Sequence, residues 1–346
     1  MRGMIDCTRL IHTKEKGSDM AVRIGFIGSG GIADAHVRAL GTVPEAQLVA
    51  FSDLVEEKAN RQASKVGGKV YTDFNAMLDK EQLDAVYLCL PPHAHGAPEL
   101  ACIERRLPFL VEKPLGNSMD VVTGILSRVN RTGLLAAVGY MNRYRRSIQR
   151  GRELLKGRKI SAVEAHWIGG TPGVAWWRRK DQSGGQLVEQ TTHLVDAIVY
   201  LVGRASEVYA VGATGTRSAP LEGCTVEDAT SVAVKFASGA VASINSCCTA
   251  YAGGGGVGLD IYGPDVTLSY RGWEMSLKAT KSRLETEEVR GEDNIFELED
   301  RAFVQAVETK DPSLVRCTYA QAYHAHQIAM AANQSLAEGR PVAVAL

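Results

Sequence analysis

The first residues of the chain that could do chemistry form a glycine-rich turn, Gly28-Ser29-Gly30-Gly31-Ile32-Ala33. Gly28, Gly30 and Ala33 occupy the positions of a G-x-G-x-x-G/A motif, after an apolar run and before a segment with helical periodicity. Glycine at these positions permits a tight turn and the close approach of a ligand, and the small alanine lets the helix pack against the strand. The helix N-terminus adds unpaired N–H groups and a positive dipole end, so the motif predicts a pyrophosphate site.

Asp53 ends the next predicted strand, twenty residues beyond Ala33. A carboxylate at this position can accept hydrogen bonds from both hydroxyls of an adenosine ribose. It would repel a 2′-phosphate, and no arginine stands beside it, so the sequence predicts NAD as the cofactor ahead of NADP. A glycine motif without a ligand is the alternative when the motif is taken alone. The predicted cofactor-binding residues in this part of the chain are Gly28, Ser29, Gly30, Gly31, Ile32 and Asp53.

Two further loops should border the cofactor, because ligands lie beyond the carboxyl ends of strands in an open α/β sheet. One begins with Leu90 and Pro91 and carries His95, which could instead have a capping or surface role. The other is Glu112-Lys113-Pro114, where proline stiffens the backbone. A lysine beside a positively charged nicotinamide would have a lowered pKa, which suits proton transfer. Taken alone, this tripeptide is also common on protein surfaces.

The second half of the chain offers a candidate base, His193. Glu189, His193 and Asp196 have the spacing i, i+4 and i+7, so they share one face if the stretch is helical. A histidine with carboxylates nearby can act as a general base toward a secondary alcohol, although it could also simply cap or pack a helix. Upstream, the stretch 176–180 contains tryptophans that could stack on a sugar and arginines that could hold a carboxylate, or it is a partly buried surface loop.

The elements that must position these residues fall into two groups. Strands and helices alternate from residue 22 to residue 139, and the strands at 85–90 and 108–111 are almost entirely apolar. Such strands are buried on both faces, which indicates a parallel sheet covered by helices. Beyond residue 142 the predicted strands are longer and alternate, as in an antiparallel sheet with one more polar face. They are expected at 162–168, 208–212, 230–236, 240–249 and 258–262, with helices at 143–158, 299–308 and 319–338.

The predicted organisation is therefore a mobile extension at 1–20, a doubly wound Rossmann domain at 21–142 and a second α/β domain at 143–346. Lysine plus arginine and aspartate plus glutamate each number 39 in the 346 residues, so no basic surplus favours nucleic acid or anionic lipid. No apolar run approaches the roughly 18 residues that cross a bilayer, and a cytoplasmic protein is expected. The seven cysteines form no C-x-x-C pair, and no metal site is predicted.

Taken together, these motifs resemble the glucose-fructose oxidoreductase and inositol dehydrogenase family (Gfo/Idh/MocA). The resemblance rests on the glycine turn, Asp53, Pro91-Pro92-x-x-His95, Glu112-Lys113-Pro114, Gly139-Tyr140 with Arg143, and Gly184-Gly185 with His193 and Asp196. It implies a Rossmann domain, a second domain with a large open sheet used for oligomer contacts, and oxidation or reduction of sugars, sugar acids or cyclitols with NAD(P). A homo-dimer or homo-tetramer is therefore expected.

The resemblance also implies roles for single residues. Lys113 would contact the nicotinamide ribose and the reacting oxygen, and His193 would take or return its proton. Glu189 stands where the family usually has aspartate, so it either contacts substrate or orients His193. The remaining cofactor contacts are expected from Leu90, Pro91, His95 and Glu112, and the substrate contacts from Tyr140, Arg143, Trp177, Arg178, Gln190 and His193. Arg143 lies near the domain junction and could instead form a salt bridge. An NAD-dependent glycoside hydrolase and a dinucleotide-sensing regulator remain alternatives.

Overall fold

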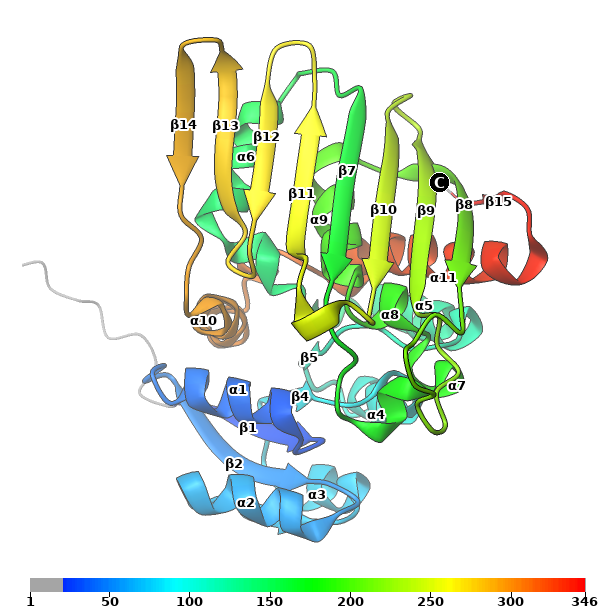
Figure 1. Cartoon of the computed structure of the whole chain (residues 1–346). Coiled ribbons are helices and arrows are strands. Elements are labelled where there is room, and N and C mark those ends of the chain that lie inside the picture. The colour runs from blue at the N-terminus through cyan, green and yellow to red at the C-terminus, as the bar shows by residue number, and fades with distance from the viewer. Residues whose placement is uncertain (1–20, 346) are drawn as a thin grey trace, which may run out of the picture.

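The computed structural model describes residues 21–345, which form two sheets with helices around them. In Figure 1 the first sheet and its helices, coloured blue to cyan, lie below the second sheet, whose strands stand upright. The predicted mobile extension at 1–20 lies outside the described residues. No helix in the described part of the chain combines the length and the apolar character needed to cross a membrane.

The first sheet has six parallel strands in the order β3-β2-β1-β4-β5-β6. Its strands carry buried apolar residues on both faces; all four residues of β4 are buried, for example. This confirms the predicted doubly wound sheet, and the order reverses between β1 and β4, where such folds bind ligands. The elements are β1 (Val22–Ile27), α1 (Gly31–Leu40), β2 (Ala46–Ser52), α2 (Glu56–Val66), β3 (Lys69–Tyr71), α3 (Phe74–Lys80), β4 (Ala85–Leu88), η1 (Pro92–Ala94), α4 (Ala97–Glu104), β5 (Phe109–Val111), α5 (Met119–Thr132) and β6 (Ala136–Val138).

The second sheet has nine strands in the order β14-β13-β12-β11-β7-β10-β9-β8-β15. Neighbouring strands are antiparallel except β7 and β10, which are parallel, so the expected mostly antiparallel sheet is confirmed. The strands are β7 (Ala162–Ile168), β8 (Ala205–Ala213), β9 (Ala229–Phe236), β10 (Val241–Cys247), β11 (Gly256–Tyr262), β12 (Thr267–Arg271), β13 (Ser276–Ser282), β14 (Glu285–Val289) and β15 (Val342–Ala343). Four of them, β12 to β15, were not anticipated because they are short or rich in charged residues.

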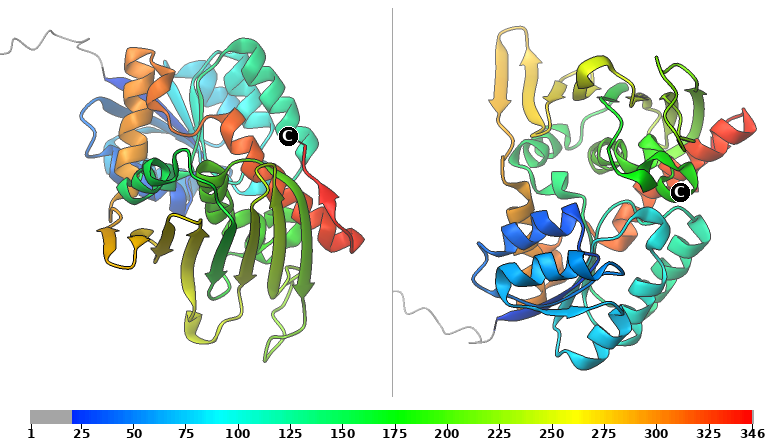
Figure 2. Two further views of the ribbon diagram at one scale, coloured as in Figure 1. Left: turned by 90° about the horizontal axis from the view of Figure 1, so that it is seen from above. Right: turned by 60° about the horizontal axis from the view of Figure 1, so that its bottom comes forward.

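The helices of the second half cover one face of this sheet and leave the other face open, as Figures 1 and 2 show. Outward residues of β9 and β10 are exposed and inward residues are buried, in strict alternation. The remaining elements are η2 (Met141–Tyr144), α6 (Arg146–Leu155), η3 (Ala175–Arg178), α7 (Lys180–Ser183), α8 (Gln186–Glu189), α9 (Thr192–Val202), η4 (Tyr251–Gly253), α10 (Ile295–Thr309), η5 (Pro312–Leu314) and α11 (Tyr319–Glu338).

After the second sheet the chain returns to the first domain. Helix α10 packs against α1 and β1, and its Phe303 and Val304 join the hydrophobic core that contains Ile24 and Phe26. The following segment pairs with β6, where Val138 N donates to the carbonyl of Cys317 over 2.9 Å. The two domains are therefore tied together by a segment that follows the second sheet in sequence but packs against the first domain.

Candidate active site

The glycine turn lies at the carboxyl end of β1, as the motif predicts. Gly28 has φ of +90°, and a Cβ there would lie 2.2 Å from the carbonyl oxygen of Cys89, so only glycine fits. Gly30 is the N-cap of α1, and nothing lies within 4 Å of a Cβ built on Gly30 or Gly31. The side-chain oxygen of Ser29 is buried without a hydrogen-bond partner. The turn thus offers open space and an unused polar group at a helix N-terminus, which fits a dinucleotide phosphate.

Asp53 is held next to this turn. Its Oδ2 accepts from Ser29 N and its Oδ1 accepts from Val55 N, both over 2.9 Å. The sequence placed no arginine beside Asp53, but Nη2 of Arg61, from α2, donates to the carbonyl of Ser29 over 3.4 Å. Sequence reasoning missed this cation because Arg61 comes eight residues after Asp53 in the chain. A carboxylate and a guanidinium therefore lie close to the predicted adenosine site.

The loop after β4 turns its histidine inward. Nδ1 of His95 lies 2.5 Å from Oε1 of Glu99, and the His95 side chain is fully buried. Oε2 of Glu99 accepts from Gly96 N at the start of α4. His95 Nε2 has no partner, so the ring keeps one nitrogen for a ligand that enters the loop. Leu90 and Pro91 lead from β4 into this loop, at the same edge of the sheet as Gly28.

Glu112 was expected to contact the cofactor, but its side chain is buried more deeply in the protein than such a contact would require. It is 3% exposed; its Oε1 lies 3.1 Å from Nε2 of His36, and its Oε2 accepts from Lys113 N over 3.1 Å. His36 in turn places Nδ1 2.8 Å from Oδ1 of Asp300 in α10. Both ring nitrogens therefore face carboxylates. Burial alone would lower the pKa of His36, but Asp300 and Glu112 outweigh it and raise the pKa well above its usual value.

Lys113 reaches from the first domain to the second. Its Nζ donates to Oε1 of Glu189 over 2.8 Å and to the Glu189 carbonyl over 3.0 Å. Burial would lower the Lys113 pKa, but the carboxylates of Glu189 and Glu112 outweigh it, and the net pKa is raised. Without cofactor the glutamates therefore keep the ammonium charged, and the lowering of the pKa expected beside a charged nicotinamide stays a prediction.

The prediction that Glu189, His193 and Asp196 share one face of a helix is wrong. The stretch is not one helix: α8 ends at Glu189 and α9 begins at Thr192. Glu189 does not orient His193, since its Oε2 accepts from Trp177 Nε1 over 2.8 Å while its Oε1 holds Lys113. Trp177, expected to contact substrate, is 1% exposed and serves this carboxylate. Asp196 pairs with a different residue, Arg143.

Two predicted substrate contacts are taken up by protein partners. Arg143 donates from Nε and Nη2 to the carboxylate of Asp196 over 2.9 and 2.6 Å, and it is 2% exposed. The hydroxyl of Tyr140 lies 2.7 Å from Thr192 Oγ1 and is fully buried. Burial, with a smaller effect of Asp196, raises the Tyr140 pKa above its usual range. Arg143 and Tyr140 therefore fix α9 against the first domain rather than face a ligand.

His193 lies among aromatic rings. Trp167 is nearly parallel to it with centroids 5.9 Å apart, and Tyr140 and Trp273 stand edge-on at 6.2 and 6.1 Å. Burial, then Lys113 and Arg145, lower its pKa well below the usual value, so the imidazole is neutral near pH 7. Its Nδ1 has no partner. Trp167, Trp273 and Arg145 were missed by the sequence analysis, because no local motif marks them.

Two predicted substrate residues keep unused polar atoms. Oε1 of Gln190 and Nε of Arg178 are both buried without a partner. Gln190 lies in the break between α8 and α9, next to the Glu189 that holds Lys113. These atoms, with His193 Nδ1 and Lys113 Nζ, are polar groups near the break between α8 and α9 and the domain junction that could meet a bound molecule.

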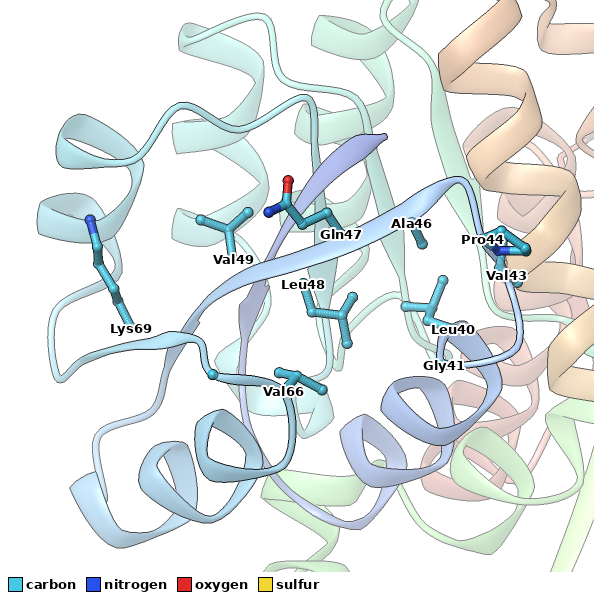
Figure 3. A pocket seen from close by; sticks show the side chains of 11 residues that line it. Leu40, Gly41, Val43, Pro44, Ala46, Gln47, Leu48, Val49, Val66 and Lys69 are labelled. Atoms are coloured by element: carbon cyan, nitrogen blue, oxygen red, sulfur yellow. The ribbon is translucent and has the colours of Figure 1, made fainter. Parts of the chain in front are cut away.

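A surface hollow of about 530 Å³ lies elsewhere. Figure 3 shows its lining side chains, among them Leu40, Pro44, Leu48 and Val66, around the start of β2 and the ends of α1 and α2. This is the amino-terminal end of β2, whereas Asp53 follows the carboxyl end of that strand. None of the predicted site residues lines this hollow, so it is separate from the candidate active site.

Comparison with known proteins agrees with this geometry. Residues 22–140 match the model of an oxidoreductase family with an NAD-binding Rossmann fold, and residues 157–269 match the GFO/IDH/MocA C-terminal domain. An uncharacterized oxidoreductase of Bacillus subtilis, YrbE, is 26% identical over 92% of this chain and 96% of its own length. Inositol 2-dehydrogenase of Rubrobacter xylanophilus is 27% identical over 67% of this chain and 66% of its own.

Among solved structures, a levoglucosan dehydrogenase in complex with NADH and levoglucosan superimposes with a TM-score of 0.84 at 20% identity. The match covers 94% of this chain and all of that one, which confirms the two-domain fold. The expected family, the Rossmann domain and NAD as the cofactor type are confirmed by these matches. The chain belongs to the GFO/IDH/MocA oxidoreductase family, and its first domain is an NAD-binding Rossmann domain.

Proposed function

We propose that the protein is an NAD-dependent dehydrogenase that moves a hydride between nicotinamide and a hydroxyl-bearing ring carbon of a sugar, sugar acid or cyclitol. The observation that carries the proposal is the contact of Lys113 Nζ with Glu189 across the domain junction, and the Lys113 charge is also one of the causes that lower the pKa of His193. The names of two relatives, an inositol 2-dehydrogenase and a levoglucosan dehydrogenase, support a polyhydroxylated ring as substrate.

The residues around the glycine turn fit NAD. Backbone N–H groups at the start of α1, together with the unpartnered Ser29 oxygen, would hold the pyrophosphate, and Asp53 would accept from the ribose hydroxyls. Leu90, Pro91 and His95 would line the path toward the nicotinamide, and Glu112, buried against His36, would support Lys113 through its backbone N–H. When bound, the nicotinamide supplies a carbon that accepts or returns the hydride.

Lys113 and His193 have different roles at the reacting oxygen. The charged Lys113 ammonium donates a hydrogen bond to this oxygen and stabilises negative charge that develops there. His193 is neutral and can take the hydroxyl proton, which a protonated imidazole could not. Glu189 keeps Lys113 charged and fixes the position of Nζ through two contacts. Gln190 and Arg178 would bind hydroxyls on the rest of the substrate.

The test is NAD reduction by purified protein with inositols, aldoses, an anhydrosugar and uronic acids. Stoichiometric NADH with a ketone or lactone product is expected for at least one compound. Release of sugar from a glycoside without net NADH would support the hydrolase alternative, which the relatives do not favour. Tight NAD binding with no turnover of any compound would overturn the dehydrogenase and support the regulator.

A further inference from the structure

Three aromatic rings from different elements meet at the mouth of the site. They are Trp167 at the end of β7, His193 in α9 and Trp273 in the turn between β12 and β13. The ring centroids are 5.9, 5.9 and 6.1 Å apart, so each ring touches the other two. His193 is 5% exposed, whereas Trp273 is 49% exposed. The histidine side of the cluster is therefore buried, and the Trp273 side is exposed to solvent.

The sheet fixes the position of Trp167. Val163, Ala165 and Trp167 alternate along β7, and the first two are buried against the helices. Trp167 follows them on the same face, at the carboxyl end of the strand. Nε2 of Gln186 donates to the Trp167 carbonyl over 3.3 Å, which secures the end of the strand.

A buried arginine fixes the position of Trp273. Nη2 of Arg145 donates to the Trp273 carbonyl over 3.1 Å, and Arg145 is fully buried. Its other groups donate to Asn142 Oδ1 over 2.7 Å and to the Glu292 carbonyl over 2.6 Å. Gly272, with φ of +76°, starts the turn. All three Arg145 contacts are to neutral oxygens, so this buried charge ties the turn of Trp273 to the domain junction.

A large apolar ring that is held rigidly and left half exposed costs free energy unless it meets a partner. The ring next to Trp273 is the proposed base, so the partner is the molecule from which that base takes a proton. Polyhydroxylated rings present C–H groups on their faces, and such a face is apolar enough to pack against an indole. Proximity to His193 thus separates Trp273 from the other exposed apolar residues of the chain.

Charges around the site favour a substrate without a charge of its own. Lys113 is paired with Glu189 over 2.8 Å and Arg143 with Asp196 over 2.6 Å. In the nearby loops, the pairs are Arg179 with Asp181, Lys180 with Glu227 and Arg217 with Asp228. A phosphate or carboxylate on the substrate would have to compete with one of these carboxylates. Arg178 is the exception among the described cations of the 176–180 loop, since its buried Nε has no partner.

We propose that Trp273, with Trp167 behind it, forms an aromatic wall that receives the C–H face of a closed, uncharged ring while His193 acts on its hydroxyl. The proposal rests on the dehydrogenase function above and names the substrate class. Arg145 is a positioning residue for this wall. Selectivity arises because an open chain has no flat face for the indole and an anion would have to compete with the carboxylates already paired with Lys113 and Arg143.

The first experiment compares Trp273→Ala and Trp273→Phe with the wild type on the best uncharged ring. Trp273→Ala should raise KM about tenfold and leave kcat within threefold, because stacking binds ground and transition states alike. Trp273→Phe should raise KM only two- to threefold, roughly in proportion to the ring area retained. Leu284→Ala is the matched control: Leu284 is 99% exposed in the next turn of the same sheet, and KM should not change.

A second measurement compares kcat/KM for myo-inositol, levoglucosan and D-xylose with that for glucose 6-phosphate, glucuronate and the open-chain sorbitol. At least one closed, uncharged ring should exceed all three others by tenfold or more. If an anionic or open-chain compound is preferred, or if Trp273→Ala leaves KM unchanged, the wall is refuted and the dehydrogenase function stands. Preference for glucuronate would point to Arg178. If no compound is oxidised by NAD, the proposed function falls and this inference falls with it.

Discussion

Lys113 and His193 are adjacent but carry different charges, because glutamates surround the lysine and aromatic rings surround the histidine. We expect Lys113→Ala and His193→Ala each to lower kcat by roughly 10² or more, since both act mainly on the transition state. NAD affinity should stay within a few fold. Steady-state NADH formation and cofactor fluorescence measure the two quantities, with the exposed Lys58→Ala as control.

The double variant Lys113→Ala with His193→Ala should lose less than the product of the single losses, because the two groups serve one proton transfer. Independent, multiplicative losses would argue that they act in separate steps. Near-wild-type turnover in His193→Ala would remove the histidine from the mechanism. Tyr140 is then a poor substitute, because its buried hydroxyl already bonds to Thr192.

The lowered pKa of His193 predicts a pH profile. Oxidation needs the neutral imidazole, so kcat/KM should hold as the pH falls to about 6.5, the ordinary histidine value, and decline only below it. Lys113→Gln removes a positive charge that lowers this pKa, so the decline should move toward neutral pH. Residual-activity profiles and an NMR titration of the His193 ring check the shift. An unmoved profile would mean that burial and Arg145, rather than Lys113, set the pKa.

Cofactor preference is a prediction about Asp53. Its carboxylate lies at Ser29 N and should exclude a 2′-phosphate, so NAD(H) should bind more tightly than NADP(H). Asp53→Ser with Leu54→Arg should move the ratio of affinities toward NADP(H) by roughly tenfold or more. Adding Arg61→Ala should reduce this gain, because Arg61 lies at the same turn. Fluorescence titration decides the matter, and a wild-type preference for NADP(H) would contradict it.

The predicted residues that the structure places at the expected edge of the first sheet share one property: a local motif marks them. Gly28 and Asp53 are predictable because strand, turn and helix follow one another in a fixed order in a parallel sheet covered by helices. Arg145 and Trp273 are 128 residues apart in the chain, and no local sequence pattern predicts their contact. The partners of Glu189 and Arg143 could not be identified from the sequence for the same reason, since Glu189 contacts Lys113 and Trp177 and Arg143 pairs with Asp196.

Secondary structure was predictable wherever hydrophobic periodicity extended over a whole element. The break between α8 and α9 was not, because residues 186–196 keep helical spacing while the backbone turns at Gln190 and Thr191. This break matters, since it points Glu189 toward Lys113 and leaves His193 among the tryptophans. Strands β12 to β14 were missed because their residues are partly charged, yet the turn between β12 and β13 carries Trp273.

Helix α10 supports the loop of Glu112 and Lys113 through a buried network that joins Asp300, His36 and Glu112. Removing the imidazole by His36→Leu leaves two buried carboxylates without their partner, so it should destabilise the protein by about 3–5 kcal/mol. The pKa of His36 is raised in the folded protein, so this contribution is complete below its unfolded pKa and is lost as pH rises through the folded one. Denaturant unfolding near pH 6 therefore shows it best.

Glu299 lies in the same helix as Asp300, but we expect its charge to contribute little to stability. Burial, then Glu112, raises its pKa well above the usual value, and neither of its oxygens has a partner, so the fold favours the protonated carboxyl. Glu299→Gln should therefore change the free energy of unfolding by less than about 1 kcal/mol. A loss as large as that of His36→Leu would show that Glu299 is ionised in the network. Equal, small losses in both variants would show that α10 does not depend on these charges.

At the scale of the whole molecule, the open face of the second sheet is unusual for a monomer. Tyr209, Val211, Val241 and Tyr262 are large apolar residues on this face, each between 37% and 52% exposed. Because strand neighbours in register point the same way, these side chains form one surface that helices do not cover. Apolar surface of this kind is typically buried by association, and a symmetric interface uses the same patch twice.

We therefore expect a homo-dimer or homo-tetramer joined through this face. Val211→Lys with Val241→Lys places two charges on it and should lower the mass measured by light scattering at micromolar concentration, because an unpaired charge is costly inside an interface. Val66→Lys, a 41% exposed residue of the first domain, is the control and should leave the mass unchanged. A monomeric wild type would refute the assembly. An oligomer that survives the double variant would place the interface on another surface, and the aromatic wall, on the covered face of the sheet, would be unaffected in either case.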